Sequence, residues 1–217
     1  MSAAYHLAFF DVDSTLVTIE GIDELAGGNP EIARLTEAAM DGSIAIDEVY
    51  GRRLEIIKPT SQDVMVLGSR YVASLLPDAL SVFRELRANG VEIHLLSAGI
   101  AQAILPLADY LGLPERAVHA VKLLFDEDGR YRDFDRRSPL ARSGGKELEI
   151  MNIRARTHGK AVMVGDGVSD LEAKGAVDLF IGFGGVRIRE AVRAASPIYL
   201  TEPRLQPLVD IILRGTS

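Results

Sequence analysis

A short apolar run that ends in two aspartates constrains the fold of this chain more than any other stretch. Residues 7–10 are all apolar, and Asp11-Val12-Asp13 follows directly. Apolar runs of this length, ended by polar turn residues, are typical of buried strands. Side chains at positions i and i+2 of an extended segment point the same way, so we expect Asp11 and Asp13 to project together. Two carboxylates at such a short distance repel each other unless one binds a proton or a cation lies between them. By itself, the stretch would equally suit a strand that runs into an ordinary polar turn.

Strand-like and helix-like segments alternate along most of the remaining chain, which favours a parallel sheet covered by helices on both faces. We therefore predict an α/β fold with a Rossmann-like parallel-sheet core. A helix is expected to begin at Pro77, and a hairpin turn is expected at 126–130. The further predicted strands are 91–96, 117–125, 131–134, 160–164, 178–183 and 197–200.

Residues 18–75 carry helix signals and no strand pattern. Asn29 is placed to cap a helix that begins at Pro30, and Thr60 is placed to cap another. A further helix is expected over residues 44–57. We predict an all-helical cap lobe over residues 18–75, inserted after the first strand, with residues 1–17 and 76–217 forming the core.

Composition excludes several classes of site and partner. The chain of 217 residues has no cysteine, which rules out disulfides, thiolate zinc sites and thiol nucleophiles. Its net charge of −7 disfavours nucleic acid and anionic membranes as partners. The most apolar window, residues 91–113, is interrupted by polar residues, and the N-terminus lacks the pattern of a signal peptide. We therefore expect a cytoplasmic protein. The sequence leaves the oligomeric state open.

Candidate functional groups follow several predicted strands and one predicted helix start. The carboxyl ends of parallel strands meet at one edge of a sheet, where ligands bind. Clustered carboxylates need a hard cation, and oxygen ligands favour Mg²⁺. A cation, a lysine and the amides at a helix start suit a phosphate group. The groups in question are Asp11, Asp13, Ser97, Lys146, Asp166 and Asp170.

These residues, in this order, resemble the four motifs of the haloacid dehalogenase superfamily of aspartate-nucleophile phosphotransferases, and they span nearly the whole chain. The motifs are Asp11-Val12-Asp13-Ser14-Thr15, Ser97 at the end of a strand, Lys146, and Gly165-Asp166-Gly167-Val168-Ser169-Asp170.

Further segments resemble the phosphoserine phosphatase family within that superfamily. Two positions depart from the family pattern: Ala98 and Asp41 stand where many members have glycine. The matching segments are residues 20–26, 39–40, 53–54, 143–146 and 180–185.

The resemblance implies a role for each motif residue. Asp11 would attack phosphorus, and Asp13 would protonate the leaving alkoxide and then deprotonate the attacking water. Mg²⁺ would bind the Asp11 carboxylate, the Asp13 backbone carbonyl and Asp166. Ser97 and Lys146 would hold phosphate oxygens, and Asp170 would orient Lys146 or metal-bound water. The remaining substrate contacts would come from Met40, Ala98 and Gly99.

Two charged residues outside the motifs are candidates for substrate recognition. Arg53 falls on the apolar stripe of the predicted helix 44–57, where a guanidinium needs an anion such as a ligand carboxylate. The alternative is a guanidinium that reaches solvent or pairs with a structural acid. Glu20 could bind an ammonium group, or be an ordinary exposed loop residue. With the aspartate site for phosphate, the two match the three charges of phosphoserine, and the resemblance assigns them these roles.

The predicted function is Mg²⁺-dependent hydrolysis of O-phospho-L-serine to L-serine and phosphate, the last step of serine biosynthesis, through an aspartyl-phosphate. The predicted partner is a small-molecule phosphoester. Two alternatives stay open: the same chemistry on another phosphoester, or phosphoryl transfer to homoserine. A phospho-aspartate signalling switch is a more distant one. The four histidines are scattered along the chain and suggest no catalytic role.

Overall fold

A six-stranded parallel sheet forms the centre of the computed structural model, which describes residues 3–215; residues 1–2 and 216–217, at the ends of the predicted core, lie outside it. The strand order is β3-β2-β1-β6-β7-β8. The strands span β1 Leu7–Phe10, β2 Glu92–Ile100, β3 Val118–Val121, β6 Ala161–Gly165, β7 Leu179–Phe183 and β8 Ile198–Leu200. The predicted α/β fold is confirmed.

The first apolar run becomes the central strand β1. All four of its residues are buried, and it pairs with β2 on one side and β6 on the other. The chain leaves β1 toward one half of the sheet and later returns to build the other half. The strand order therefore reverses beside β1, which creates the crevice where parallel sheets bind ligands.

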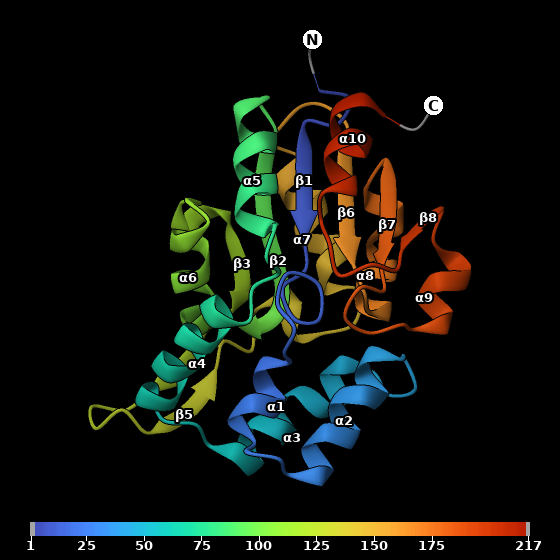
Figure 1. Ribbon diagram of the computed structural model, residues 1–217. Coiled ribbons are helices and arrows are strands. Elements are labelled where there is room, and N and C mark those ends of the chain that lie inside the picture. Colours follow the sequence, from blue (N-terminus) through green and yellow to red (C-terminus); the bar gives the residue numbers. More distant parts are fainter. Residues whose placement is uncertain (1–2, 216–217) are drawn as a thin grey trace.

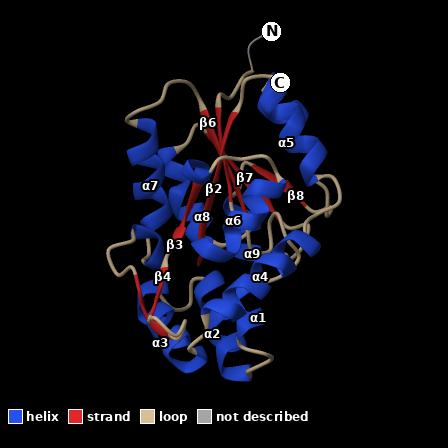
Figure 2. Ribbon diagram, turned by 90° about the vertical axis from the view of Figure 1, so that its left-hand side faces the viewer, coloured by secondary structure: helices blue, strands red, loops and turns tan. Residues whose placement is uncertain are grey.

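Helices cover both faces of the sheet. Figure 2 shows the sheet nearly edge-on, with α7 on one side and α5 on the other. The helices that follow the second strand are α6 Ala101–Tyr110, α7 Gly145–Arg154, α8 Val168–Glu172, α9 Glu190–Ala195 and α10 Pro207–Arg214. With both faces covered, the inner strands β1, β6 and β7 are buried along their whole length, whereas the edge strands β3 and β8 are largely half-buried.

Four helices lie between β1 and α5 Ala79–Ala88, near the carboxyl ends of the strands (Figure 1). Residues 17 and 75 form an antiparallel bridge, so this helical segment begins and ends at the same place. Asn29 and Thr60 cap their helices as predicted, and Thr60 forms a capping box with Asp63. The four helices are α1 Gly21–Leu25, α2 Pro30–Met40, α3 Ile46–Ile57 and α4 Ser61–Ala73.

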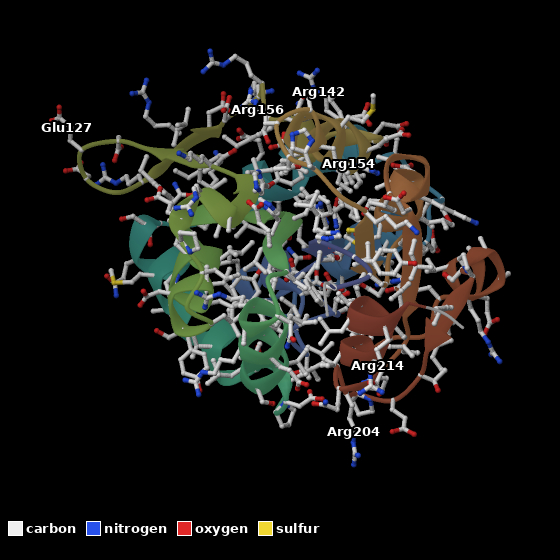
Figure 3. The ribbon with its side chains drawn as sticks, turned by 90° about the horizontal axis from the view of Figure 1, so that it is seen from above. Glu127, Arg142, Arg154, Arg156, Arg204 and Arg214 are labelled. Atoms are coloured by element: carbon white, nitrogen blue, oxygen red, sulfur yellow. The ribbon has the colours of Figure 1, made fainter. Side chains whose placement is uncertain are left out.

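The predicted strand over residues 117–125 is wrong, because the chain breaks there into β3 and a separate strand. The side-chain amide of Gln102 donates to the Leu123 carbonyl (2.7 Å) and accepts from the Leu123 amide (3.1 Å). These bonds occupy the backbone groups that would continue the ladder. β4 Leu123–Phe125 instead pairs with β5 Tyr131–Phe134 in a hairpin, which projects outward with Glu127 near its tip (Figure 3).

Several predicted boundaries also moved, most of them by one or two residues. The helix after Pro77 begins at Ala79, and the Asp78 carboxylate accepts from the amides of Leu205 and Gln206 instead of capping its own helix. The strand predicted at 91–96 runs from Glu92 to Ile100. Among the described residues, no helix is long and apolar enough to cross a membrane.

Candidate active site

A pocket opens at the carboxyl end of β1, facing the helices α1–α3. It is lined by nine of the residues singled out in the sequence, together with Gly21, Ile22, Thr36 and Ser169. The nine are Asp11, Asp13, Glu20, Met40, Arg53, Ser97, Ala98, Gly99 and Lys146.

A tight loop after β1 sets the two leading aspartates. The Asp11 amide donates to the Val164 carbonyl of β6 (3.0 Å), so the chain is still held by the sheet at this point. The amides of Leu16 and Val17 then both donate to the Val12 carbonyl, which turns the chain back on itself. Ser14 takes a left-handed conformation in this turn (φ 51°). The strand end is therefore a closed loop that holds Asp11 and Asp13 over the sheet.

Lys146, in the first turn of α7, reaches into the centre of the site. Its Nζ lies 2.9 Å from Asp11 Oδ1 and 2.5 Å from Asp170 Oδ1. Burial disfavours the charged form, but the two carboxylates outweigh it and raise the pKa of Lys146 above its usual range. The residue is therefore a fixed ammonium group beside Asp11.

Asp13 points away from this ion pair. Its Oδ1 accepts from the Gly21 amide (2.7 Å) and the Tyr71 hydroxyl (2.8 Å). Burial and the nearby charge of Asp11 raise the pKa of Asp13 to about 7. A carboxyl group in this state holds a proton during part of its time near neutral pH, as a general acid and base must.

Three buried carboxylates, from Asp11, Asp166 and Asp170, offer oxygen atoms that all lie within 4.8 Å of one another. Burial, followed by neighbouring carboxylates, raises the pKa of Asp166 to about 7 and that of Asp170 to about 8. The predicted metal set grouped Asp11 and Asp166 with the backbone carbonyl of Asp13. The structure adds the Asp170 carboxylate to this cluster, and it turns the Asp13 side chain toward Tyr71.

The side chains of the site carry a net negative charge that a divalent cation would balance. The buried carboxylates of Asp11, Glu20, Asp166 and Asp170, together with partly buried Asp13, face three buried cationic side chains. These are Arg53, Lys146 and Arg189. When all are ionised, two negative charges remain, and hard oxygen ligands of this kind suit Mg²⁺.

The segment Ser97-Ala98-Gly99 forms another part of the pocket wall. The Gly99 amide donates to Ser97 Oγ (2.9 Å), and Ser97 Oγ lies 3.5 Å from Asp13 Oδ2. A Cβ at position 99 would lie 2.9 Å from Asp13 Oδ2 and 3.0 Å from Ser97 Oγ, so a side chain there would displace these two groups. Alanine at position 98 is accommodated at the pocket wall.

Arg53 enters the pocket from α3 with a side chain that is almost fully buried (2% exposed). Its NH1 donates to Thr36 Oγ1 (3.1 Å), and its Nε has no hydrogen-bond partner. Within the described range 3–215, no carboxylate lies within the 4.0 Å of an ion pair from its guanidinium. The alternatives of a solvent-reaching guanidinium or a structural ion pair are therefore wrong.

Glu20 is also buried (7% exposed), so the alternative of an exposed loop residue is wrong. Its Oε1 accepts from Ser14 Oγ (2.5 Å) and lies 3.6 Å from Arg189 NH2. Burial and the charge of Asp13 raise the pKa of Glu20 to about 8.

Comparison with known proteins places this site in a family. The model of the haloacid dehalogenase-like hydrolases matches residues 5–178. A chloroplastic phosphoserine phosphatase of Arabidopsis thaliana is 41% identical over 85% of this chain, which spans 65% of that relative's length. A phosphoserine phosphatase of Homo sapiens is 36% identical, with 89% of this chain and 88% of the relative covered. The chain belongs to the phosphoserine phosphatase family of haloacid dehalogenase-like hydrolases.

The same fold is found in solved structures. A phosphoserine phosphohydrolase-like protein from Francisella tularensis superposes with a TM-score of 0.85 and 26% identity, covering 98% of this chain and all of that one. The phosphoserine phosphatase family uses Mg²⁺, in agreement with the acidic cluster described above.

Some residues of this family member's site were missed in the sequence. Arg189 is buried (5% exposed), and its Nε lies 3.0 Å from Asp166 Oδ2. Its NH1 lies 3.0 Å from Glu37 of α2, so it links the core to the helical segment. Thr36 and Tyr71 were missed as well. None of the three stands in a motif, and only packing brings them to the site.

The structure also places Asp41 and two of the four histidines. Asp41, one of the two departures from the family pattern, is exposed, and its carboxylate accepts from the amide and hydroxyl of Ser43. His94 and His119 are not scattered in space: His94 Nδ1 lies 3.1 Å from His119 Nε2, on β2 and β3. Neither histidine lines the pocket that contains Asp11.

Proposed function

We propose that this protein hydrolyses O-phospho-L-serine to L-serine and phosphate, the last step of serine biosynthesis. The family membership supports the reaction type, and the pocket supports the substrate. Asp11 and Lys146, from the core, line the pocket. Arg53 and Glu20 line it as well, and both belong to the helical segment after β1. Phosphoserine carries a phosphate, a carboxylate and an ammonium group, which these charges complement.

The buried guanidinium of Arg53 carries the substrate assignment. A buried charge without a partner is costly, and a ligand carboxylate would satisfy it through paired N–H donors. Thr36 holds one nitrogen of the group and leaves Nε free. An ammonium group bound beside Glu20 would lower the raised pKa of this carboxyl group and favour its charged form, which then pairs with the ammonium group.

The first step forms an aspartyl-phosphate. A carboxylate oxygen of Asp11 attacks phosphorus, and the bond between phosphorus and the serine oxygen breaks. Asp13 gives its proton to the departing serine oxygen. Lys146 and Ser97 hold the phosphate oxygens, and the ammonium group of Lys146 offsets the charge that builds up beside Asp11.

The second step hydrolyses this intermediate. Asp13, now a carboxylate, takes a proton from a water molecule that attacks phosphorus, and the bond to Asp11 breaks. Phosphate leaves and Asp11 returns as a carboxylate. Asp170 holds Lys146 in place through both steps.

The acidic cluster supports Mg²⁺ as the resident cation. We propose that the Asp11 carboxylate, the Asp13 backbone carbonyl and Asp166 hold it, with Asp170 beside them. When bound, the cation neutralises charge on the transferred phosphoryl group.

We also propose the division into a core of residues 1–17 and 76–217 and a helical cap of residues 18–75. The bridge between residues 17 and 75 supports it, since the segment leaves and rejoins the core at one point. A cytoplasmic location, and the lack of nucleic-acid and membrane partners, stay predictions.

The test is phosphate release from a panel of phosphoesters, with Mg²⁺ and with a chelator. The panel holds L-phosphoserine, phosphothreonine, phosphohomoserine, 3-phosphoglycerate and nucleoside monophosphates. We expect L-phosphoserine to be preferred and the chelator to abolish turnover. A preference for another ester would refute the substrate and keep the mechanism. A stable phospho-enzyme without turnover would instead indicate a signalling switch.

A further inference from the structure

Tyr71 joins the helix α4 to the catalytic loop. Its side chain is fully buried, and its hydroxyl donates to Asp13 Oδ1 (2.8 Å). The Gly21 amide donates to the same oxygen (2.7 Å). A carboxylate oxygen offers two lone pairs, so these two donors occupy Oδ1.

The other oxygen of Asp13 lies beside Ser97 and Gly99, two residues that line the pocket. Asp13 Oδ2 lies 3.5 Å from Ser97 Oγ, and it is the atom nearest to the space beside Gly99. A proton on the Asp13 carboxyl group therefore belongs on Oδ2, since Oδ1 already accepts two hydrogen bonds.

Gly21 makes the contact between Tyr71 and Asp13 possible. A Cβ at position 21 would lie 2.0 Å from the Tyr71 hydroxyl oxygen, closer than any two such atoms approach. A side chain at this position would displace the tyrosine from Asp13. The glycine at the start of α1 and the tyrosine on α4 thus depend on each other, although 50 positions of sequence separate them.

We propose that Tyr71 is a positioning residue, which together with the Gly21 amide holds Asp13 so that Oδ2 carries its proton toward the leaving group. This inference rests on the proposed function of Asp13 as general acid. In the first step the proton passes from Oδ2 to the ester oxygen as the bond from that oxygen to phosphorus breaks. In the second step the same Oδ2 takes a proton from water.

The leaving group distinguishes this role from simple packing. Proton transfer contributes most when the departing oxygen is strongly basic, as in serine, and little when it is weakly basic, as in 4-nitrophenol. Tyr71→Phe keeps the ring and removes only the hydroxyl. With Mg²⁺ present, we expect kcat/KM for phosphoserine to fall roughly 10-fold. The fall should be in kcat, and kcat/KM for 4-nitrophenyl phosphate should change less than about twofold.

A matched control is available in Tyr50→Phe. Tyr50 is also fully buried, but its hydroxyl has no hydrogen-bond partner and does not line the pocket. This variant should leave both reactions unchanged. Gly21→Ala is the second test, because it displaces the hydroxyl of an intact Tyr71, and it should show the same selective loss. Thermal melting verifies that each variant is folded.

A series of substituted phenyl phosphates of similar size completes the test. We expect kcat/KM of Tyr71→Phe, which reports the first step alone, to depend more steeply on leaving-group basicity than kcat/KM of the wild type. An equal fall in kcat/KM on all esters, or no fall on phosphoserine, would overturn the role of Tyr71. If the wild type fails to hydrolyse phosphoserine, the proposed substrate is wrong, and the phenyl phosphate series still decides the role of Tyr71.

Discussion

Lys146 Nζ lies 2.9 Å from Asp11 Oδ1, so a buried ammonium group touches the carboxylate that we assign as nucleophile. The contact pairs Asp11 with a cation in a site crowded with other acids. It also places a positive charge where phosphate oxygens would lie. Asp170 holds Lys146 from the other side and fixes its position.

Lys146→Ala should therefore lower kcat for phosphoserine by at least about 100-fold, because a transition-state charge loses its partner. Steady-state kinetics at saturating Mg²⁺ measures this. Lys160→Ala, at an exposed position outside the pocket, is the control and should behave like the wild type. A mutant that retains full kcat would exclude Lys146 from the reaction.

Asp11→Asn should abolish turnover, because an amide oxygen is too weak a nucleophile to form the phospho-enzyme. Rapid acid quenching followed by mass spectrometry should detect phosphate on the wild type and not on the variant. Asp210→Asn, a change of the same kind on the exposed surface of α10, should have no effect. Normal activity of Asp11→Asn would show that Asp11 is not the nucleophile.

Arg53→Ala should weaken the binding of substrates that carry a carboxylate and leave the binding of other substrates unchanged. The lost ion pair should cost about 2 kcal/mol of binding free energy, which raises KM for phosphoserine roughly 30-fold. The neighbouring Arg52 is exposed and pairs with Glu31 on the surface, so Arg52→Ala is a close control. Equal losses on phosphoserine and phenyl phosphate would contradict a recognition role.

Stability should fall as pH rises in the absence of metal. Asp13 and Asp166 have folded-state pKa values of about 7, and Glu20 and Asp170 of about 8, against about 4 when unfolded. Between pH 4 and 8 the folded state therefore binds more protons than the unfolded state. The free energy of unfolding must decrease across this range.

Melting curves at pH 6 and pH 8, with chelator and with Mg²⁺, test this. We expect Tm to be lower at pH 8 by at least about 3 °C, the shift that about 1 kcal/mol causes in a chain of this size. Mg²⁺ should stabilise more at pH 8 than at pH 6, because it competes with protons for the same oxygens. A Mg²⁺ effect that is equal at both values would argue against binding at these carboxylates.

Arg53, in the helix predicted over residues 44–57, shows what a local sequence pattern can predict. Its position on the apolar stripe predicted that Arg53 points inward, and it does. The strand over 117–125 shows the limit. Its apolar residues looked continuous, but the side chain of Gln102, from a different element, takes the backbone groups of Leu123 and ends the ladder.

The sequence by itself determined the α/β order of elements, the helical segment after β1 and the residues of the four motifs. The elements depend on the spacing of apolar residues, capping and turn chemistry within a few positions of the chain, and the motif residues were identified by their order and their resemblance to the family. Only the tertiary structure brought Tyr71 to Asp13, Arg189 to Asp166 and Thr36 to Arg53. Such contacts join residues far apart in sequence, and their geometry is set by how helices pack over the sheet, which no local pattern encodes.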